Sequence, residues 1–130
     1  MKVLNFEASV YKANAIRKIL GNRCGVASVE QVSNVEAGLK MLKDAENAGE
    51  PFNLIITDMH FPMRSGAISD TEAGEKLVQI LQAQGNQTNI IVCSSRNMKL
   101  PGVYGCIWYS EISDWEEELC DLVREMEKNR

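Results

Sequence analysis

The sequence lacks the features that would place it in several functional classes. No run of the roughly 18 apolar residues that a membrane-spanning helix requires occurs among its 130 residues. Basic residues are outnumbered, 14 against 18 acidic ones, and the formal net charge of −4 leaves no electrostatic footprint for nucleic acid. Charges also interrupt residues 1–20 every few positions, which excludes a signal-peptide pattern. We therefore expect a cytoplasmic chain that binds neither nucleic acid nor a membrane.

Common catalytic and metal-site motifs are also missing. The chain has one histidine and four scattered cysteines, with no CxxC pair and no Cys/His spacing of a zinc site. It has no nucleophile elbow, glycine-rich phosphate loop or Cys/His pair either, so we expect no enzymatic turnover of its own. We expect the cysteines to be small buried hydrophobic residues in a reducing compartment. They are Cys24, Cys93, Cys106 and Cys120.

The sequence does contain a regular alternation of apolar runs and amphipathic stretches. Its 45% hydrophobic and 25% charged residues are typical of a soluble globular protein, and its length suits one domain spanning residues 1–130. The apolar runs predict strands, and the amphipathic stretches predict helices. The predicted strands are 3–6, 26–32, 52–57, 89–93 and 105–109, and the predicted helices run from about 10 to 20, 33 to 49, 69 to 85 and 113 to 126.

Three of the predicted helices begin at a capping-box pattern, in which a serine is followed by a glutamate three residues later. Strands that alternate with helices indicate βαβ units and a parallel sheet. Five strands in a chain of this length favour a doubly wound, flavodoxin-like α/β fold with strand order 2-1-3-4-5. Residues 94–104 contain Pro101 and Gly102 and are too short for a full crossover helix, so we expect the fourth helix to be shortened or absent. The capping pairs are Ser33 with Glu36, Ser69 with Glu72 and Ser113 with Glu116.

Residues 54–66, LIITDMHFPMRSG, carry the strongest functional pattern. An apolar run ends in Asp58, and the carboxyl ends of strands are where open α/β sheets build their sites. Pro62 and Gly66 follow at +4 and +8, where they restrict and then relax the backbone. This segment resembles the phosphoacceptor loop of bacterial response-regulator receiver domains, and the resemblance extends over nearly the whole chain.

The resemblance implies a magnesium site next to Asp58. Receivers place two acidic residues after the first strand, and these hold Mg²⁺ together with the phosphoacceptor aspartate. Here that position reads Glu7-Ala8, so one acid is missing. Glu7, Asp58 and the backbone carbonyl of His60 would supply the oxygens of a weakened Mg²⁺ site. The alternative is that Glu7 is an exposed loop carboxylate.

Two further site positions follow from the resemblance. Receivers end the fourth strand with a hydroxyl residue that contacts the phosphoryl group, which corresponds to Ser94; alternatively, Ser94 only caps a turn. They end the fifth strand with a lysine, and Tyr109 stands at that position, with no lysine between Lys99 and Lys128. An insertion at residues 67–73 is another departure from the family's pattern.

The resemblance implies that the chain is a receiver domain of a two-component phosphorelay. It would accept a phosphoryl group on Asp58 from a histidine kinase or phosphotransfer protein and signal to a downstream protein, with a homodimer possible. The alternative is a degenerate receiver that acts as a phosphorylation-independent protein-interaction module, which Ala8, Tyr109 and the missing helix favour. Either kind of receiver could stand alone or be part of a longer protein.

Overall fold

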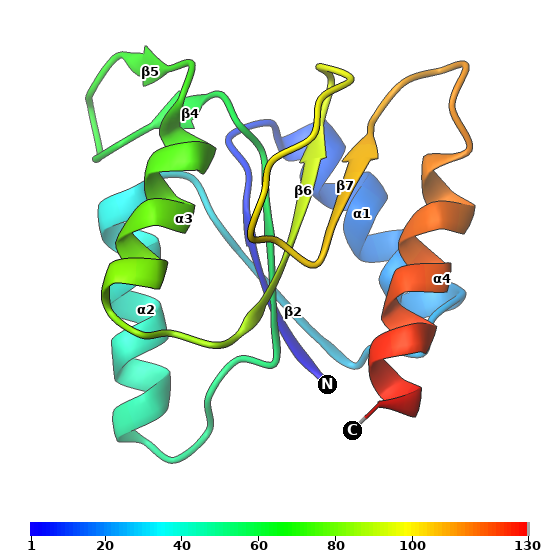
Figure 1. Ribbon diagram of the computed structural model, residues 1–130, viewed down its shortest axis with the longest axis horizontal. Helices are drawn as coiled ribbons and strands as arrows, with labels where there is room; N and C mark the ends of the chain where they lie inside the picture. The colour runs from blue at the N-terminus through cyan, green and yellow to red at the C-terminus, as the bar shows by residue number, and fades with distance from the viewer. Residues whose placement is uncertain (130) are drawn as a thin grey trace.

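Five of the predicted apolar segments pair into one parallel sheet in the computed structural model, which describes residues 1–129 (Figure 1). Each predicted strand is confirmed to within two residues at its ends. The sheet strands are β1 (Lys2–Phe6), β2 (Ser28–Val32), β3 (Leu54–Thr57), β6 (Asn89–Ser94) and β7 (Gly105–Trp108). The helices are α1 (Val10–Asn22), α2 (Val35–Asn47), α3 (Ala73–Ala83) and α4 (Trp115–Lys128), and a short ribbon adds β4 (Phe61–Pro62) and β5 (Ser69–Asp70).

The strand order is β2-β1-β3-β6-β7, which confirms the flavodoxin-like order expected from the sequence. β3 lies at the centre and pairs with β1 on one side and β6 on the other. All four of its residues are buried, as expected for a strand covered on both faces. Every neighbouring pair in this sheet is parallel, so all five strands end at the same edge.

Helices cover both faces of the sheet, α2 and α3 on one face and α1 and α4 on the other (Figure 1). Because side chains alternate along a strand, β1 sends Leu4 and Phe6 into the first layer and Val3 into the second. β3 divides in the same way, with Ile55 facing α2 and α3 and its neighbours facing α1 and α4. Among residues 1–129, the structure contains no helix with the length and hydrophobicity needed to span a bilayer.

The helix starts differ from the predicted capping boxes. Asn34, one residue after the predicted cap, is the N-cap of α2 and accepts a hydrogen bond from the amide of Ala37 at 2.8 Å. Ser69 lies in the β4–β5 ribbon, so α3 begins only at Ala73. The Ser113 hydroxyl donates to the Trp108 carbonyl at 2.6 Å and is therefore used within the loop that precedes α4. At Ser113 the hydroxyl is displaced because loop carbonyls compete with the helix end for it.

The missing fourth helix is confirmed. Residues 95–104 connect β6 to β7 without a helical segment (Figure 1). Leu100 and Val103 from this connection pack against the core layer of α2 and α3. The connection therefore covers part of the sheet face with two apolar side chains instead of a helix.

The expectation of four free thiols is wrong for two of them. Cys24, just after α1, and Cys120, in α4, form a disulfide with a Cα–Cα distance of 5.7 Å. Cys93 and Cys106 are free. The sequence spacing of 96 residues gave no sign of the pair, because only the packing of α4 beside α1 brings the two residues together.

We predict that this disulfide contributes about 4.7 kcal/mol to the free energy of unfolding, the amount expected from closing a loop of this length. Denaturant unfolding with and without dithiothreitol measures the contribution. Cys24→Ser should reproduce the stability of the reduced protein and should no longer respond to reductant. If unfolded, unreduced protein titrates with four free thiols instead of two, the bridge does not form.

A second prediction concerns Gly74, at the start of α3. A Cβ there would lie 2.3 Å from the Asp58 carbonyl oxygen and 2.9 Å from the Met59 sulfur. Because backbone cannot move aside cheaply, Gly74→Ala should destabilise the fold by about 1–3 kcal/mol. Gly21→Ala is the matched control, since its Cβ would meet nothing closer than 3.9 Å; it should be neutral or stabilising by up to about 1 kcal/mol. Equal unfolding midpoints for the two variants would contradict the close contact.

Candidate functional site

The candidate site lies where the parallel strands end. Glu7 follows β1, Asp58 follows β3 and Ser94 ends β6. Phe6 pairs with Thr57 in the β1–β3 register, so the two carboxylates follow residues that lie side by side. Alternation along each strand turns both carboxylates toward the face that α1 covers. Glu7 is only 3% exposed, so the alternative of an exposed loop carboxylate is excluded.

Lys12 of α1 is the cation between these two carboxylates. Its Nζ lies 2.8 Å from Glu7 Oε1, in an ion pair without the direction of a hydrogen bond, and 3.3 Å from Asp58 Oδ1. The same ammonium donates to the Cys93 carbonyl at 2.6 Å. The lysine is 7% exposed, so these contacts take place away from bulk water. Lys12 is not among the site residues expected from the sequence.

The charges of this cluster shift one another's protonation. Burial alone would lower the pKa of Lys12, but the negative charges around it, chiefly that of Glu7, outweigh this effect and raise it. Burial also raises the pKa of Glu7, and the attraction of Lys12 offsets this only in part. The group of two carboxylates and one ammonium has a formal charge of −1 when all three are ionised. Glu7 and Lys12 therefore hold their protons more firmly in this cluster than the same groups do when free in water.

Tyr109 lies beside this cluster, although it carries no charge to replace the lysine expected at its position. The Lys12 ammonium is 5.2 Å from the centroid of its ring, a cation–π distance. The ring also packs against Trp115, whose ring centroid is 4.9 Å away. Tyr109 is thus part of the wall of the site, while the positive charge comes from α1.

The Asp58 carboxylate is held through one of its two oxygens. Oδ1 faces Lys12 and also accepts a hydrogen bond from the Met59 amide at 2.8 Å. Beside Asp58 a pocket of about 100 Å³ opens at the strand ends. Within the described part of the chain, Oδ2 has no hydrogen bond or ion pair and is the oxygen left for this pocket. The pocket is lined by Asp58, His60, Thr71, Ser94, Ser95 and Arg96.

Ser94 and Arg96 shape the far side of that pocket. The Ser94 hydroxyl accepts a hydrogen bond from the Arg96 amide at 3.1 Å, so it does cap a turn while also lining the pocket. The Arg96 guanidinium is half exposed, donates to the Thr71 carbonyl at 3.2 Å and lies 3.7 Å from Glu72. Arg96 is a second cation near Asp58 that the sequence analysis missed.

The residues present do not fit a magnesium ion in this arrangement. Mg²⁺ requires oxygen ligands in near-octahedral geometry and usually keeps several waters. One oxygen of Glu7 and one of Asp58 are both paired with Lys12. In residues 1–129, no group of three or more His, Cys, Asp or Glu side chains is placed to hold a metal. The ligand role of the His60 carbonyl remains a prediction.

Asp70 does not take the place of the missing acid. One of its oxygens accepts from the Glu72 amide at 2.8 Å, and the other pairs with Lys76 at 2.5 Å. These bonds hold the end of the β4–β5 ribbon to the start of α3. They lower the pKa of Asp70, with the Lys76 hydrogen bond as the largest cause.

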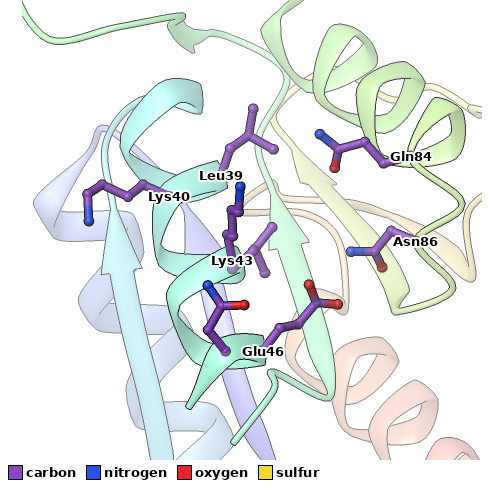
Figure 2. A pocket seen from close by; sticks show the side chains of 8 residues that line it. Leu39, Lys40, Lys43, Glu46, Gln84 and Asn86 are labelled. Carbon is purple, nitrogen blue, oxygen red and sulfur yellow. The ribbon is translucent and has the colours of Figure 1, made fainter. Parts of the chain in front are cut away.

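A hollow of about 530 Å³ lies elsewhere, between α2 and the end of α3 (Figure 2). Gln84 and Asn86 face α2 across it, while Lys40 points away and pairs with Asp44 at 2.7 Å. It is larger than the pocket at Asp58 but lacks a buried, converging set of charged groups. We therefore place the candidate site at the strand ends and not in this hollow.

Comparison with solved structures identifies the fold. The response regulatory domain of mrkE from Klebsiella pneumoniae matches with a TM-score of 0.76 and 13% identity, over 99% of this chain and 97% of that one. The receiver domain of Francisella response regulator 1452 gives 0.72 and 18%, over 98% and 97%. The phosphorylated cyanobacterial phytochrome response regulator RcpA gives 0.69 and 14%, over 98% and 91%.

No family model and no curated protein sequence matches this chain. Identities below 20% leave the common architecture as the shared property. The strand order and the four helices agree with that architecture. The chain therefore has the fold of response-regulator receiver domains.

Proposed function

We propose that this chain is a receiver of a two-component phosphorelay that accepts a phosphoryl group on Asp58 and signals to a protein partner. The observation that carries the proposal is the direction of the Asp58 contacts. They fall on Oδ1, so Oδ2 remains for the small polar pocket beside it. RcpA, which shares the fold, was solved in a phosphorylated form.

The chemistry that we propose is an attack of Oδ2 on the phosphorus of a phosphohistidine. An O–P bond forms, the P–N bond breaks, and its electron pair stays on the leaving imidazole. The Ser94 hydroxyl and the Arg96 guanidinium line the pocket that would receive the phosphoryl oxygens, and a guanidinium suits such an anion. The Lys12 ammonium would offset part of the added negative charge from the opposite side.

A phosphodonor protein has to approach Asp58 over the edge where the strands end. Two exposed apolar side chains stand at the start of α1 there, and a third lies in the connection between β7 and α4. Exposed large apolar residues are favoured at protein contacts when they stand close together. These residues are Val10, Tyr11 and Ile112, whose side chains are 66%, 82% and 84% exposed.

A second candidate function is a phosphorylation-independent interaction module. The observation that favours it is the Lys12 cluster, because the ammonium already neutralises Asp58 in part and would compete with an incoming phosphodonor for that carboxylate. In this case the same exposed edge would bind a partner constitutively.

We predict that the protein incubated with acetyl phosphate or phosphoramidate gains one phosphoryl group, visible by intact mass spectrometry. Asp58→Asn should abolish the adduct because it removes the attacking oxygen. Ser94→Ala should slow its formation by about three- to tenfold, the effect of one lost hydrogen bond. Asp44→Asn is the control, since Asp44 is an exposed carboxylate on α2, and it should label like the unaltered protein.

The absence of an adduct under conditions that label an ordinary receiver would reject phosphorylation and leave the interaction module. Equal labelling of Asp58→Asn and the unaltered protein would show that the phosphoryl group is accepted elsewhere. An acid-stable adduct would point to a hydroxyl acceptor in place of the carboxylate.

A further inference from the structure

We propose that Lys12 is the resident cation of this site, with its ammonium held between Glu7 and Asp58 in place of a divalent metal ion. The inference goes beyond the proposed function and does not depend on it, because metal binding is measured without a phosphodonor. It concerns what neutralises the acidic end of the sheet, whether or not Asp58 is ever phosphorylated.

The geometry around Nζ is that of a coordinated cation. Three oxygens from three strand ends converge on it: Glu7 Oε1 at 2.8 Å, Asp58 Oδ1 at 3.3 Å and the Cys93 carbonyl at 2.6 Å. One of these contacts, to the Cys93 carbonyl, is a hydrogen bond, and the two carboxylate contacts are ion pairs, so the ammonium has an oxygen partner at each of three strand ends. The position from which a divalent ion would contact both carboxylates is taken by this ammonium.

The lysine is fixed in this position by its helix. Ser9 caps α1 and accepts from the Lys12 amide at 3.2 Å, so the residue is held in the first turn. Ile16 and Leu20 follow at intervals of four and are buried on the same side of α1. The ammonium therefore stands at the end of an apolar stripe that packs onto the sheet, and α1 cannot rotate it away without exposing that stripe.

The position of Lys12 accounts for two departures of this sequence from the receiver pattern, Ala8 and Tyr109. Ala8 removes one of the acids of the family's metal site, so a dication would have one protein ligand fewer, while Lys12 pairs with both of the carboxylates that are left. Tyr109 removes the family's lysine, whose ammonium would otherwise stand against that of Lys12. The Tyr109 ring faces Lys12 at 5.2 Å and is attractive to it where a second ammonium would repel it.

The test measures metal binding in two ways. Electron paramagnetic resonance of free Mn²⁺ reports Mn²⁺ binding, and titration calorimetry with MgCl₂ reports Mg²⁺ binding. The unaltered protein should show no saturable binding at the site. Lys12→Met keeps an unbranched side chain of similar length and removes its charge. Its affinity for both divalent ions should rise by at least about tenfold, because the two carboxylates are released from the ammonium. Lys18→Met, on the exposed side of the same helix, should behave like the unaltered protein.

Saturable Mg²⁺ binding by the unaltered protein as tight as that of Lys12→Met would overturn the inference. So would a folded Lys12→Met that binds neither ion, because Lys12 would then not be what excludes the metal. Circular dichroism and the unfolding midpoint decide whether the variant is folded, and Lys12→Gln is the second choice if Lys12→Met is not.

Amine acetylation tests the same point on the unaltered protein. Peptide mass spectrometry should find Lys12 protected by at least about tenfold relative to Lys18, with no change when MgCl₂ is added. Acetylation of Lys12 at the rate of Lys18, or a marked acceleration by MgCl₂, would show that the ammonium is not held or that a metal displaces it. Labelling of Asp58 by a phosphodonor is a separate readout, so either proposal can fail without the other.

Discussion

The parallel pairing of β1 with β3 is the constraint on which the site depends. It brings the residues that follow the two strands, Glu7 and Asp58, to one edge and turns both onto one face. Glu7 is buried and Asp58 is only partly exposed, so little water screens the repulsion between their charges, and a cation that contacts both carboxylates offsets it. Removing one partner of a buried ion pair typically costs about 3–5 kcal/mol, since the other charge is left unpaired. The position of Lys12 is therefore a requirement of the sheet as much as of the function.

Much of the fold could be predicted from local patterns in the sequence. Short apolar runs separated by amphipathic stretches are sufficient for the strand order, and Pro101 with Gly102 is sufficient for the missing helix. Asp58 could be placed because a run of buried residues led directly to it. Helix starts were less predictable, because a neighbouring residue can cap in place of the expected serine, as Asn34 does, or the serine can bond within a loop, as the Ser113 hydroxyl does with the Trp108 carbonyl.

The positive charge of the site could not be predicted by searching for a lysine near the end of the fifth strand, where Tyr109 stands. The charge comes from α1, and its signal is a lysine on the apolar stripe with Ile16 and Leu20. A lysine at a core position of an amphipathic helix next to the edge where acidic residues collect is a pattern that could be searched for. Arg96 and the Cys24–Cys120 disulfide had no such local signal, since both depend on contacts between segments distant in sequence.

The disulfide between Cys24 and Cys120 also makes one part of the molecule more resistant to local opening than another. It joins α4 to the end of α1, and the same two helices pack on one face of the sheet. On the opposite side of β6, residues 95–104 have no helical hydrogen bonds, and the bond from the Trp108 indole to the Ser95 carbonyl at 3.1 Å ties them to β7. Segments with few internal bonds open at lower free energy than stapled helices. The 95–104 connection should therefore open at lower free energy than the stapled pair of α1 and α4, although both adjoin the site, one after Ser94 and the other through Lys12.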